Sequence, residues 1–292
     1  MPQPTAFFRD LALPSTGAPA VMAPWSPAPP PRTAARHHRT IFLSDLHLGA
    51  GMAQPEALLA FLDQNSAETY YLVGDVVDHW QPLGLNWGPA HHAAVRRLLA
   101  LPQSGARVIY IPGNHDAFFR HYAGQHVGGI TVAMDTVHVT AAGARLLVVH
   151  GDCCDVFARR APLLARLGTL IEAGARGVDA VQRRTSQAFG LGAWEGIDRS
   201  IARVNGAIRR FDGFERRLAR LAVARGLDGV VCGHFHQPAL TTVMDVTYAN
   251  CGDWAGSNTA VLEAFDGRLS LHRMPARGTP ETVAQPDLPC PA

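Results

Sequence analysis

Five short apolar runs in this chain each lead into residues that can bind a metal ion or exchange a proton. The runs lead into Asp45-Leu46-His47, Gly74-Asp75, Gly113-Asn114-His115-Asp116, His150-Gly151-Asp152 and Gly233-His234-Phe235-His236. Apolar runs of this length between turns are typical of buried strands. In open α/β sheets, ligand sites lie just beyond the carboxyl ends of such strands. This recurrence predicts an α/β fold in which the five segments meet at one site.

Helical and strand patterns alternate through the central part of the chain. Apolar residues at helical spacing predict helices over 55–64 and about 88–101. Short apolar runs predict strands over 41–43, 69–73, 107–111, 145–149, 229–232, 246–250 and 259–263. We expect a folded domain over 39–274. The Pro- and Ala-rich residues 1–38 are expected to form a disordered arm, and residues 275–292 a loose tail.

An arginine-rich segment separates the last two motifs. From Arg159 to Arg225, fourteen Arg outnumber six acidic residues, an excess of +8 within a chain whose net charge is +2. Apolar residues at helical spacing predict that three or four amphipathic helices are inserted at about 155–226. The charge favours an anionic partner, although such arginines can also form a solvated face on helices that only pack on the core. Nucleic acid is not expected, because the segment lacks aromatics interleaved with its basic residues.

Composition places the protein among globular, cytoplasmic chains. Of its 292 residues, 47% are hydrophobic and 17% charged, and no apolar run approaches the ~20 residues of a membrane span. The five cysteines form no even framework, so we expect reduced thiols, with Cys232 and Cys251 in the core. The N-terminus shows no secretory pattern, because Arg9 and Asp10 interrupt its apolar stretch.

The candidate ligands share one chemical character. They offer oxygen or imidazole nitrogen and no thiolate: Asp45, His47, Asp75, Asn114, His150, His234 and His236. This set suits Mn²⁺, Fe, Co²⁺ or Zn²⁺ better than a structural zinc site. Seven ligands are too many for one such ion and about right for two ions that share a bridging carboxylate. Two ions ~3.5–4 Å apart can clamp the attacking and leaving oxygens of a phosphoryl displacement.

A structural interpretation competes with the metal site at each position. A lone histidine after a strand is more often a core residue than a ligand, and Asp78 and Asp152 fit loop hydrogen bonds as well as a direct role. A metal-free scaffold with the same fold is a second class of protein. Such a scaffold would have lost ligands, whereas every expected ligand type is present in this chain.

Taken in order, Asp45-x-His47, Gly74-Asp75-x-x-Asp78, Gly113-Asn114-His115-Asp116, His150-Gly151-Asp152 and Gly233-His234-x-His236 resemble the five motif blocks of calcineurin-like metallophosphoesterases. The resemblance implies a four-layer α/β/β/α sandwich with a dinuclear, commonly manganese, site. By matching position it implies that one metal is held by Asp45, His47 and His236. The second would be held by Asn114, His150 and His234, with Asp75 as the bridge.

The same resemblance assigns the residues around the metals. His115 matches the family's histidine that contacts the phosphate and protonates the leaving oxygen, a task suited to a group with a pKa near 6.5. Asp116 would orient His115. Asp78 would either have a structural role or contact a metal-ligating side chain without binding the metal itself. Asn114 and His115 are therefore the expected catalytic residues.

Further details are similar to the UDP-2,3-diacylglucosamine pyrophosphatases of lipid A synthesis. These enzymes carry a helical cap at the position of the arginine-rich insert, and Gly252-Asp253-Trp254 is also shared. The resemblance implies cleavage of a UDP-acylated sugar to UMP and a lipid phosphate, with peripheral contact to the inner membrane. This chain has His115 where those enzymes usually have Arg. The alternative is therefore a phosphodiesterase or phosphatase that acts on another nucleotide or on a phospholipid.

Overall fold

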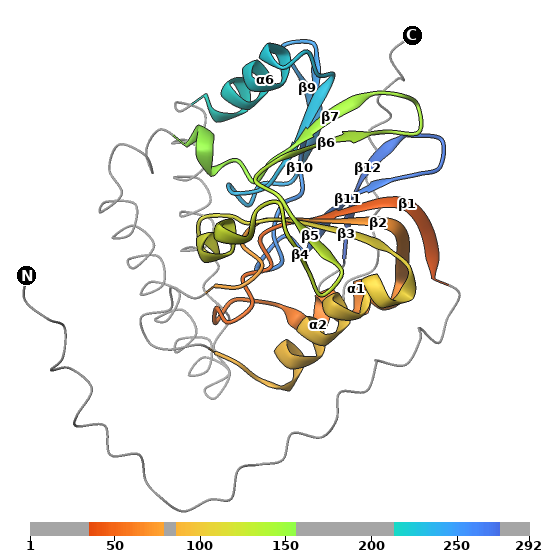
Figure 1. The fold of residues 1–292 in the computed structure, drawn as a ribbon, viewed down its shortest axis with the longest axis vertical. Helices are drawn as coiled ribbons and strands as arrows, with labels where there is room; N and C mark the ends of the chain where they lie inside the picture. The colour runs from red at the N-terminus through yellow and green to blue at the C-terminus, as the bar shows by residue number, and fades with distance from the viewer. Residues whose placement is uncertain (1–34, 79–85, 156–212, 275–292) are drawn as a thin grey trace, which may run out of the picture.

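The computed structural model describes residues 35–78, 86–155 and 213–274, and these residues form two mixed sheets packed face to face (Figure 1). The larger sheet has the order β12-β11-β1-β2-β3-β5-β4 and the smaller the order β6-β7-β8-β10-β9. The larger sheet contains β1 (Arg36–Leu43), β2 (Asn65–Val73), β3 (Arg107–Ile111), β4 (His126–Val127), β5 (Ile130–Val132), β11 (Thr259–Glu263) and β12 (Leu269–Arg273). The smaller contains β6 (Thr136–Val139), β7 (Arg145–Val148), β8 (Gly229–Cys232), β9 (Ala239–Val243) and β10 (Val246–Asn250).

Parallel pairing brings the motif-bearing strand ends to one side of the molecule. In the larger sheet β1 pairs with β2 and β2 with β3 in parallel, with Leu43 opposite Leu72 and Val73 opposite Ile111. In the smaller sheet β7, β8 and β10 are parallel neighbours. Antiparallel strands complete both sheets at their edges. The carboxyl ends of six parallel strands therefore lie at adjacent edges of the two sheets.

Helices cover the outer faces of both sheets. The described helices are α1 (Pro55–Gln64), α2 (Pro89–Ala100) and α6 (Phe214–Ala224), with short 3-10 turns η1 (Pro102–Ser104), η2 (Ala117–Tyr122) and η3 (Asp152–Cys154). Both α1 and α2 begin with a proline, whose missing N–H is no loss in the first turn. Leu58 and Leu62 of α1 pack on the larger sheet, and Leu218 of α6 packs on the smaller.

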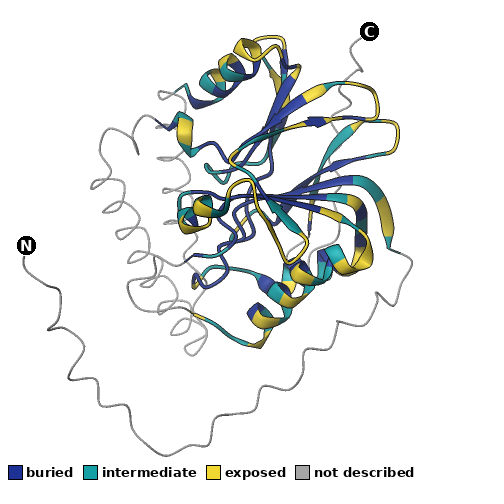
Figure 2. Ribbon diagram, in the orientation of Figure 1, coloured by how far each residue is buried: buried dark blue, intermediate teal, exposed yellow. Residues whose placement is uncertain are grey.

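Strand alternation divides the core into three layers. Ile41 and Leu43 point towards α1 and α2, whereas Phe42 between them points into the space between the sheets. In the smaller sheet, Leu147 faces α6 and Leu146 faces the larger sheet. Figure 2 shows buried residues concentrated in the strands and exposed residues on the outer faces of the helices. The predicted α/β/β/α sandwich is confirmed.

The element boundaries differ from the sequence-based expectation at β1, at β2, which begins at Asn65 and not at residue 69, and in the expected insert. β1 begins at Arg36, so His37 and His38 lie in a strand and not in the arm expected over 1–38; their side chains contact Ser66 and Asn65 of β2. At the end of the expected insert, α6 is a layer of the sandwich, because its apolar face covers β8 and β10. The rest of the predicted cap (156–212), the arm before residue 35 and the tail over 275–292 lie outside the described residues.

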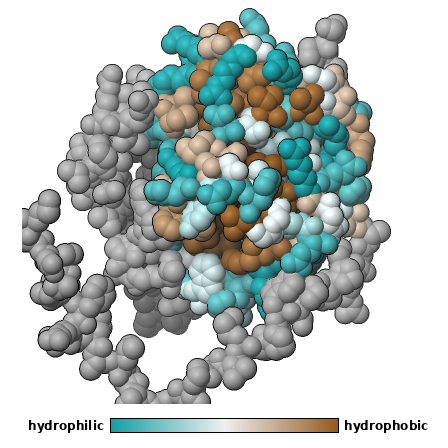
Figure 3. Space-filling view, in the orientation of Figure 1, coloured by the Kyte–Doolittle hydropathy of each residue, from teal (hydrophilic) through white to brown (hydrophobic). Residues whose placement is uncertain are grey.

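Membrane-spanning helices and disulfides are not found in the described part of the chain. No described helix is long and apolar enough to cross a bilayer. The four cysteines within the described ranges form no disulfide, and Cys232 and Cys251 are buried in the core as expected. On the face shown in Figure 3, hydrophobic and hydrophilic residues are interspersed over the described surface, which is ordinary for a folded domain.

A buried carboxylate joins the two sheets at the end of β11. Glu263 is fully buried and accepts hydrogen bonds from Arg39 Nη1 at 2.6 Å, Thr40 Oγ1 at 2.6 Å, His138 Nε2 at 2.8 Å and Ala141 N at 2.8 Å. Burial by itself would raise the pKa of Glu263. The hydrogen bonds from His138, Thr40 and Ala141 outweigh it and lower that pKa from 4.5 to about 2.

We expect Glu263→Gln to destabilise the protein and to change its response to acid. A carboxylate with a depressed pKa stabilises the fold fully above its unfolded pKa of 4.5, and this stabilisation disappears as the pH falls towards 2. At about 1.4 kcal/mol per pKa unit, the contribution at pH 7 is on the order of 3 kcal/mol. Urea unfolding between pH 7 and pH 3 measures it. The exposed Glu68→Gln serves as the control, and equal stability of the two variants at pH 7 would contradict the prediction.

Candidate metal centre

All seven predicted ligands lie at the carboxyl ends of parallel strands. Asp45 and His47 follow β1, Asp75 follows β2 and Asn114 follows β3. From the smaller sheet, His150 follows β7, and His234 and His236 follow β8. Four of the seven side chains are buried, among them His47 at 4% exposure and Asp75 at 1%. The other three are half-buried. The two sheets thus bring together residues that are far apart in sequence.

The first ligand group is formed by Asp45, His47 and His236, whose ligand atoms lie within 4.8 Å of one another. The Nε2 atoms of His47 and His236 are 3.1 Å apart. Asp45 Oδ1 is 3.2 Å from His236 Nε2 and 3.7 Å from His47 Nε2. This buried oxygen makes no hydrogen bond within the described residues. A buried carboxylate oxygen facing two imidazole nitrogens fits a divalent cation.

The second ligand group is formed by Asp75, His150 and His234, which also lie within 4.8 Å of one another. His150 Nε2 is 3.4 Å from Asp75 Oδ2 and 3.3 Å from Asn114 Oδ1. Asp75 Oδ2 is in addition 4.0 Å from His47 Nε2 of the first group. Asp75 therefore lies between the two groups, as a bridging carboxylate would.

The backbone at the site is held in a rarely populated conformation. Asp45, His47, Asp75, His234 and His236 all have positive φ, between 45° and 72°. Left-handed backbone at residues other than glycine costs about 1–3 kcal/mol per residue and is concentrated at functional sites. Strained backbone at five candidate ligands therefore indicates a functional site and not only a well-packed core.

Two glycines allow these strand ends to approach closely. A Cβ at Gly113 would collide with the Asp75 carboxylate and lie 2.7 Å from His150 Nε2. A Cβ at Gly233 would collide with Ser44 Oγ and with Asp45 Oδ2. The glycines that precede Asn114 and His234 in the motifs are therefore needed for close approach between the strand ends, including ends that belong to different sheets.

Each candidate histidine ligand has its second ring nitrogen held by an oxygen. His150 Nδ1 is 2.9 Å from the Val73 carbonyl, and this bond leaves Nε2 facing Asp75. His47 Nδ1 is 3.4 Å from Asp78, His234 Nε2 is 2.9 Å from Asp155 and His236 Nδ1 is 3.4 Å from Asp253. Such oxygens fix the tautomer and the ring orientation of histidine ligands.

The sequence analysis missed Asp155 and Asp253 as partners of His234 and His236. Asp155 follows the His150-Gly151-Asp152 motif by three residues, and Asp253 follows the apolar strand β10. The position of Asp253 after a buried strand was the one signal that matched the recurring pattern.

The structure also corrects the expected partner of His115. His115 Nδ1 lies 3.2 Å from Asp78 Oδ1, so Asp78 is the carboxylate that faces this ring. Asp116 instead accepts hydrogen bonds from Val76 N at 2.7 Å, Gly113 N at 2.6 Å and the Tyr110 hydroxyl at 2.5 Å. It is turned into the core, where it holds the loop after β3 to the loop after β2.

Opposite charges are balanced inside the site. Burial alone would lower the pKa of His47, but the neighbouring carboxylates of Asp45 and Asp78 raise it to about 9. Burial would likewise lower the pKa of His150, but the carboxylate of Asp75 raises it to about 10. A divalent cation must displace these protons when it binds, so metal affinity falls as the pH falls. The donor set of carboxylates, one amide and imidazoles fits two such cations.

Comparison with known proteins agrees with this geometry. Residues 38–238 match the profile of the calcineurin-like phosphoesterases. The chain belongs to this family. It is therefore a hydrolase, and its family and its two ligand groups make it a metal-dependent phosphohydrolase.

The phosphoesterase has relatives of modest identity. A UDP-2,3-diacylglucosamine hydrolase of Xanthomonas campestris pv. campestris is 28% identical over 262 residues, which cover 80% of this chain and 98% of the relative. One from Aeromonas salmonicida is 32% identical over 121 residues, 39% of this chain and 45% of that protein. These relatives confirm the resemblance to this group. The structure of an archaeal phosphodiesterase aligns with 80% of this chain and 98% of its own, at 12% identity and a TM-score of 0.39.

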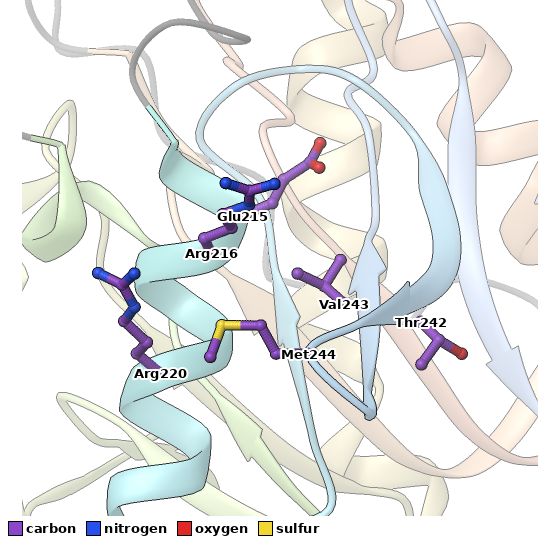
Figure 4. Close-up of a pocket in the computed structure, with 6 residues that line it drawn as sticks. All are labelled: Glu215, Arg216, Arg220, Thr242, Val243 and Met244. Atoms are coloured by element: carbon purple, nitrogen blue, oxygen red, sulfur yellow. The ribbon is translucent and has the colours of Figure 1, made fainter.

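A pocket on the smaller sheet lies apart from the ligand groups. It is lined by Glu215, Arg216, Arg220, Thr242, Val243 and Met244 (Figure 4). Arg216 and Arg220 project from α6, and Met244 lies in the turn between β9 and β10. The pocket shares no residue with either ligand group, so we do not assign the reaction to it.

Proposed function

We propose that this phosphoesterase hydrolyses the pyrophosphate of UDP-2,3-diacylglucosamine or a close analogue. A water oxygen would bond to one phosphorus while the bridging P–O bond breaks, which yields UMP and a lipid phosphate. The observation that supports the chemistry best is the pair of adjoining ligand groups on either side of Asp75. The choice of substrate is supported by the relatives that are named for it.

In this proposal each ligand group holds one divalent cation, which we propose to be Mn²⁺. One would be bound by Asp45, His47 and His236, the other by Asn114, His150 and His234, with Asp75 shared by both. The cations would stabilise negative charge on the phosphoryl oxygens and lower the pKa of the attacking water.

His115 and the proposed ligand Asn114 would act on the substrate. Asp78 holds His115 through Nδ1, so the other ring nitrogen is the one that would give its proton to the leaving oxygen. Asn114 follows directly on Gly113, and its amide nitrogen would donate to a phosphoryl oxygen while Oδ1 faces the second group. Asp116 keeps both residues in place by anchoring the loop after β3.

A second candidate is hydrolysis of another nucleotide or phospholipid by the same site. The observation that favours it is His115, because the UDP-2,3-diacylglucosamine pyrophosphatases resembled here usually carry Arg at this position. Histidine can donate a proton, whereas Arg stays charged and contributes a bidentate contact instead. The arginine-rich insert, of which 156–212 lie outside the described residues, would bind the lipid and its diphosphate in the first candidate. For that substrate we also propose a cytoplasmic enzyme in peripheral contact with the inner membrane.

Hydrolysis of three substrates by the purified protein with Mn²⁺ tests the proposal. UDP-2,3-diacylglucosamine, UDP-N-acetylglucosamine and bis(p-nitrophenyl) phosphate are compared, with EDTA as the metal-free control. We expect kcat/KM for the acylated substrate to exceed that for UDP-N-acetylglucosamine at least ~100-fold, because burial of only three or four methylenes provides about 2.7 kcal/mol. Turnover of the diester alone would reject this substrate and favour the second candidate.

A further inference from the structure

The carboxyl end of β10 lies beside strand ends that supply three candidate ligands. β10 is parallel to β8, which is parallel to β7. β7 leads into His150, β8 leads into His234 and His236, and β10 leads into Cys251, Gly252 and Asp253. Asp253 is 6% exposed, although it is a carboxylate. A buried carboxylate at this edge of the sheet requires partners that compensate its charge.

One oxygen of Asp253 faces a candidate metal ligand. Asp253 Oδ2 is 3.4 Å from His236 Nδ1. The opposite nitrogen of the same ring, Nε2, is 3.2 Å from Asp45 Oδ1 and 3.1 Å from His47 Nε2. The His236 ring therefore lies between Asp253 on one side and the first ligand group on the other.

The other oxygen of Asp253 anchors its own loop. Asp253 Oδ1 accepts hydrogen bonds from Ala255 N at 3.1 Å, Gly256 N at 2.7 Å and Ser257 N at 2.8 Å. Next to it, Trp254 N donates to the Asp45 carbonyl at 3.0 Å. These bonds fix the carboxylate relative to the first ligand group, and they commit Oδ1 to the loop, so that Oδ2 is the atom turned to His236.

We propose that Asp253 is a positioning residue that holds the hydrogen of His236 on Nδ1 and thereby keeps Nε2 available to a divalent cation. The inference rests on the proposed two-metal function and adds to it a residue outside both ligand groups. Carboxylates in this position commonly set the tautomer of histidine ligands, and their loss weakens metal binding by about 10- to 100-fold.

Asp253→Asn tests the tautomer directly. The three N–H groups of the loop require an acceptor at the position of Oδ1, so the asparagine amide must turn its NH₂ group towards His236. That NH₂ group can only donate, so it would favour the His236 tautomer with its hydrogen on Nε2. A protonated Nε2 has no free lone pair and cannot bind a cation. We expect titration of the metal-free variant with Mn²⁺ to show one site weakened about 10- to 100-fold. The site that contains Asp75 and His150 should be much less affected.

Ser257→Ala is the matched control. Ser257 Oγ accepts from Asp253 N at 2.9 Å, so this change loosens the same loop and leaves Oδ2 opposite His236. Its metal affinities should remain close to those of the wild type. If Ser257→Ala and Asp253→Asn weaken binding equally, the role of Asp253 is only to stabilise the loop and the inference is overturned.

A spectroscopic measurement on the wild-type protein covers the case in which Asp253→Asn does not fold. Nitrogen-15 spectra of histidine-labelled protein loaded with diamagnetic Zn²⁺ should show His236 protonated on Nδ1 and metal-bound through Nε2. Protonation on Nε2 would overturn the inference. Wild-type protein that binds no divalent cation would overturn the proposed function as well. Two sites of unchanged affinity in Asp253→Asn would overturn the inference alone.

Discussion

Replacing Asp75 by alanine is expected to remove bound metal and hydrolytic activity together. Asp75 is the carboxylate that lies between both ligand groups, 3.4 Å from His150 Nε2 and 4.0 Å from His47 Nε2. In the proposed arrangement both cations share Asp75, so without it neither cation would keep its full set of donors. The rate should fall by ~10³-fold or more, which corresponds to about 4 kcal/mol of transition-state stabilisation, the range expected for a catalytic metal. Metal content by mass spectrometry and kcat on the substrates above measure both effects.

Asp63→Ala is the control for the loss of an aspartate. Asp63 lies on α1, its side chain is 62% exposed, and its contact with Arg97 Nη2 is 3.8 Å. An exposed ion pair of this kind contributes at most ~1 kcal/mol, so metal content and rate should be unchanged. An Asp75→Ala protein that still binds two cations and turns over at the wild-type rate would rule out the bridging role.

Replacing His115 by alanine is expected to separate metal binding from catalysis. His115 belongs to neither of the groups formed by Asp45, His47 and His236 and by Asp75, His150 and His234. It lies in a third cluster with His47 and Asp78, in which its Nδ1 is 3.2 Å from Asp78. The variant should therefore bind two cations, while kcat falls ~10²- to 10⁴-fold through loss of the proton donor. A substrate with a good leaving group, such as a p-nitrophenyl ester, should be less affected, since its leaving oxygen needs less help from a proton.

His121→Ala is the matched control for His115. His121 is exposed on η2, and its Nδ1 is 2.9 Å from the Phe118 carbonyl, so its loss should change neither metal content nor rate. Asp78→Asn should reproduce part of the His115→Ala effect, because it removes the carboxylate that orients that ring. If His115→Ala keeps both its metals and the wild-type rate, His115 has no part in the reaction.

Local periodicity was sufficient to predict the buried elements. α1 spans Pro55–Gln64, β3 Arg107–Ile111 and β8 Gly229–Cys232, as expected from the spacing of their apolar residues. β9 (Ala239–Val243) and β12 (Leu269–Arg273) were not predicted. Both are edge strands whose residues are mostly half-buried or exposed. A strand that buries little surface carries few apolar residues, so its sequence shows only a weak strand pattern.

The start of β1 could not be predicted for a related reason. Arg36, His37 and His38 carry no apolar signal, and they are ordered by pairing with Asn65, Ser66 and Ala67 of β2. The hydrogen bonds of that pairing come from a strand that is distant in sequence. Strand register is therefore a property of the sheet and is not visible in the residues of one strand.

The sequence by itself determined which residues offer oxygen or imidazole donors just after buried strands, and the carboxyl ends of such strands are where ligand sites lie in α/β sheets. Only the tertiary structure decided how those residues are supported. The neighbour of His115 in sequence, Asp116, is turned into the core by Val76, Gly113 and Tyr110, and the carboxylate beside His115 is Asp78. Hydrogen-bond partners are selected by direction and distance in the folded chain, and these depend on how two sheets pack together.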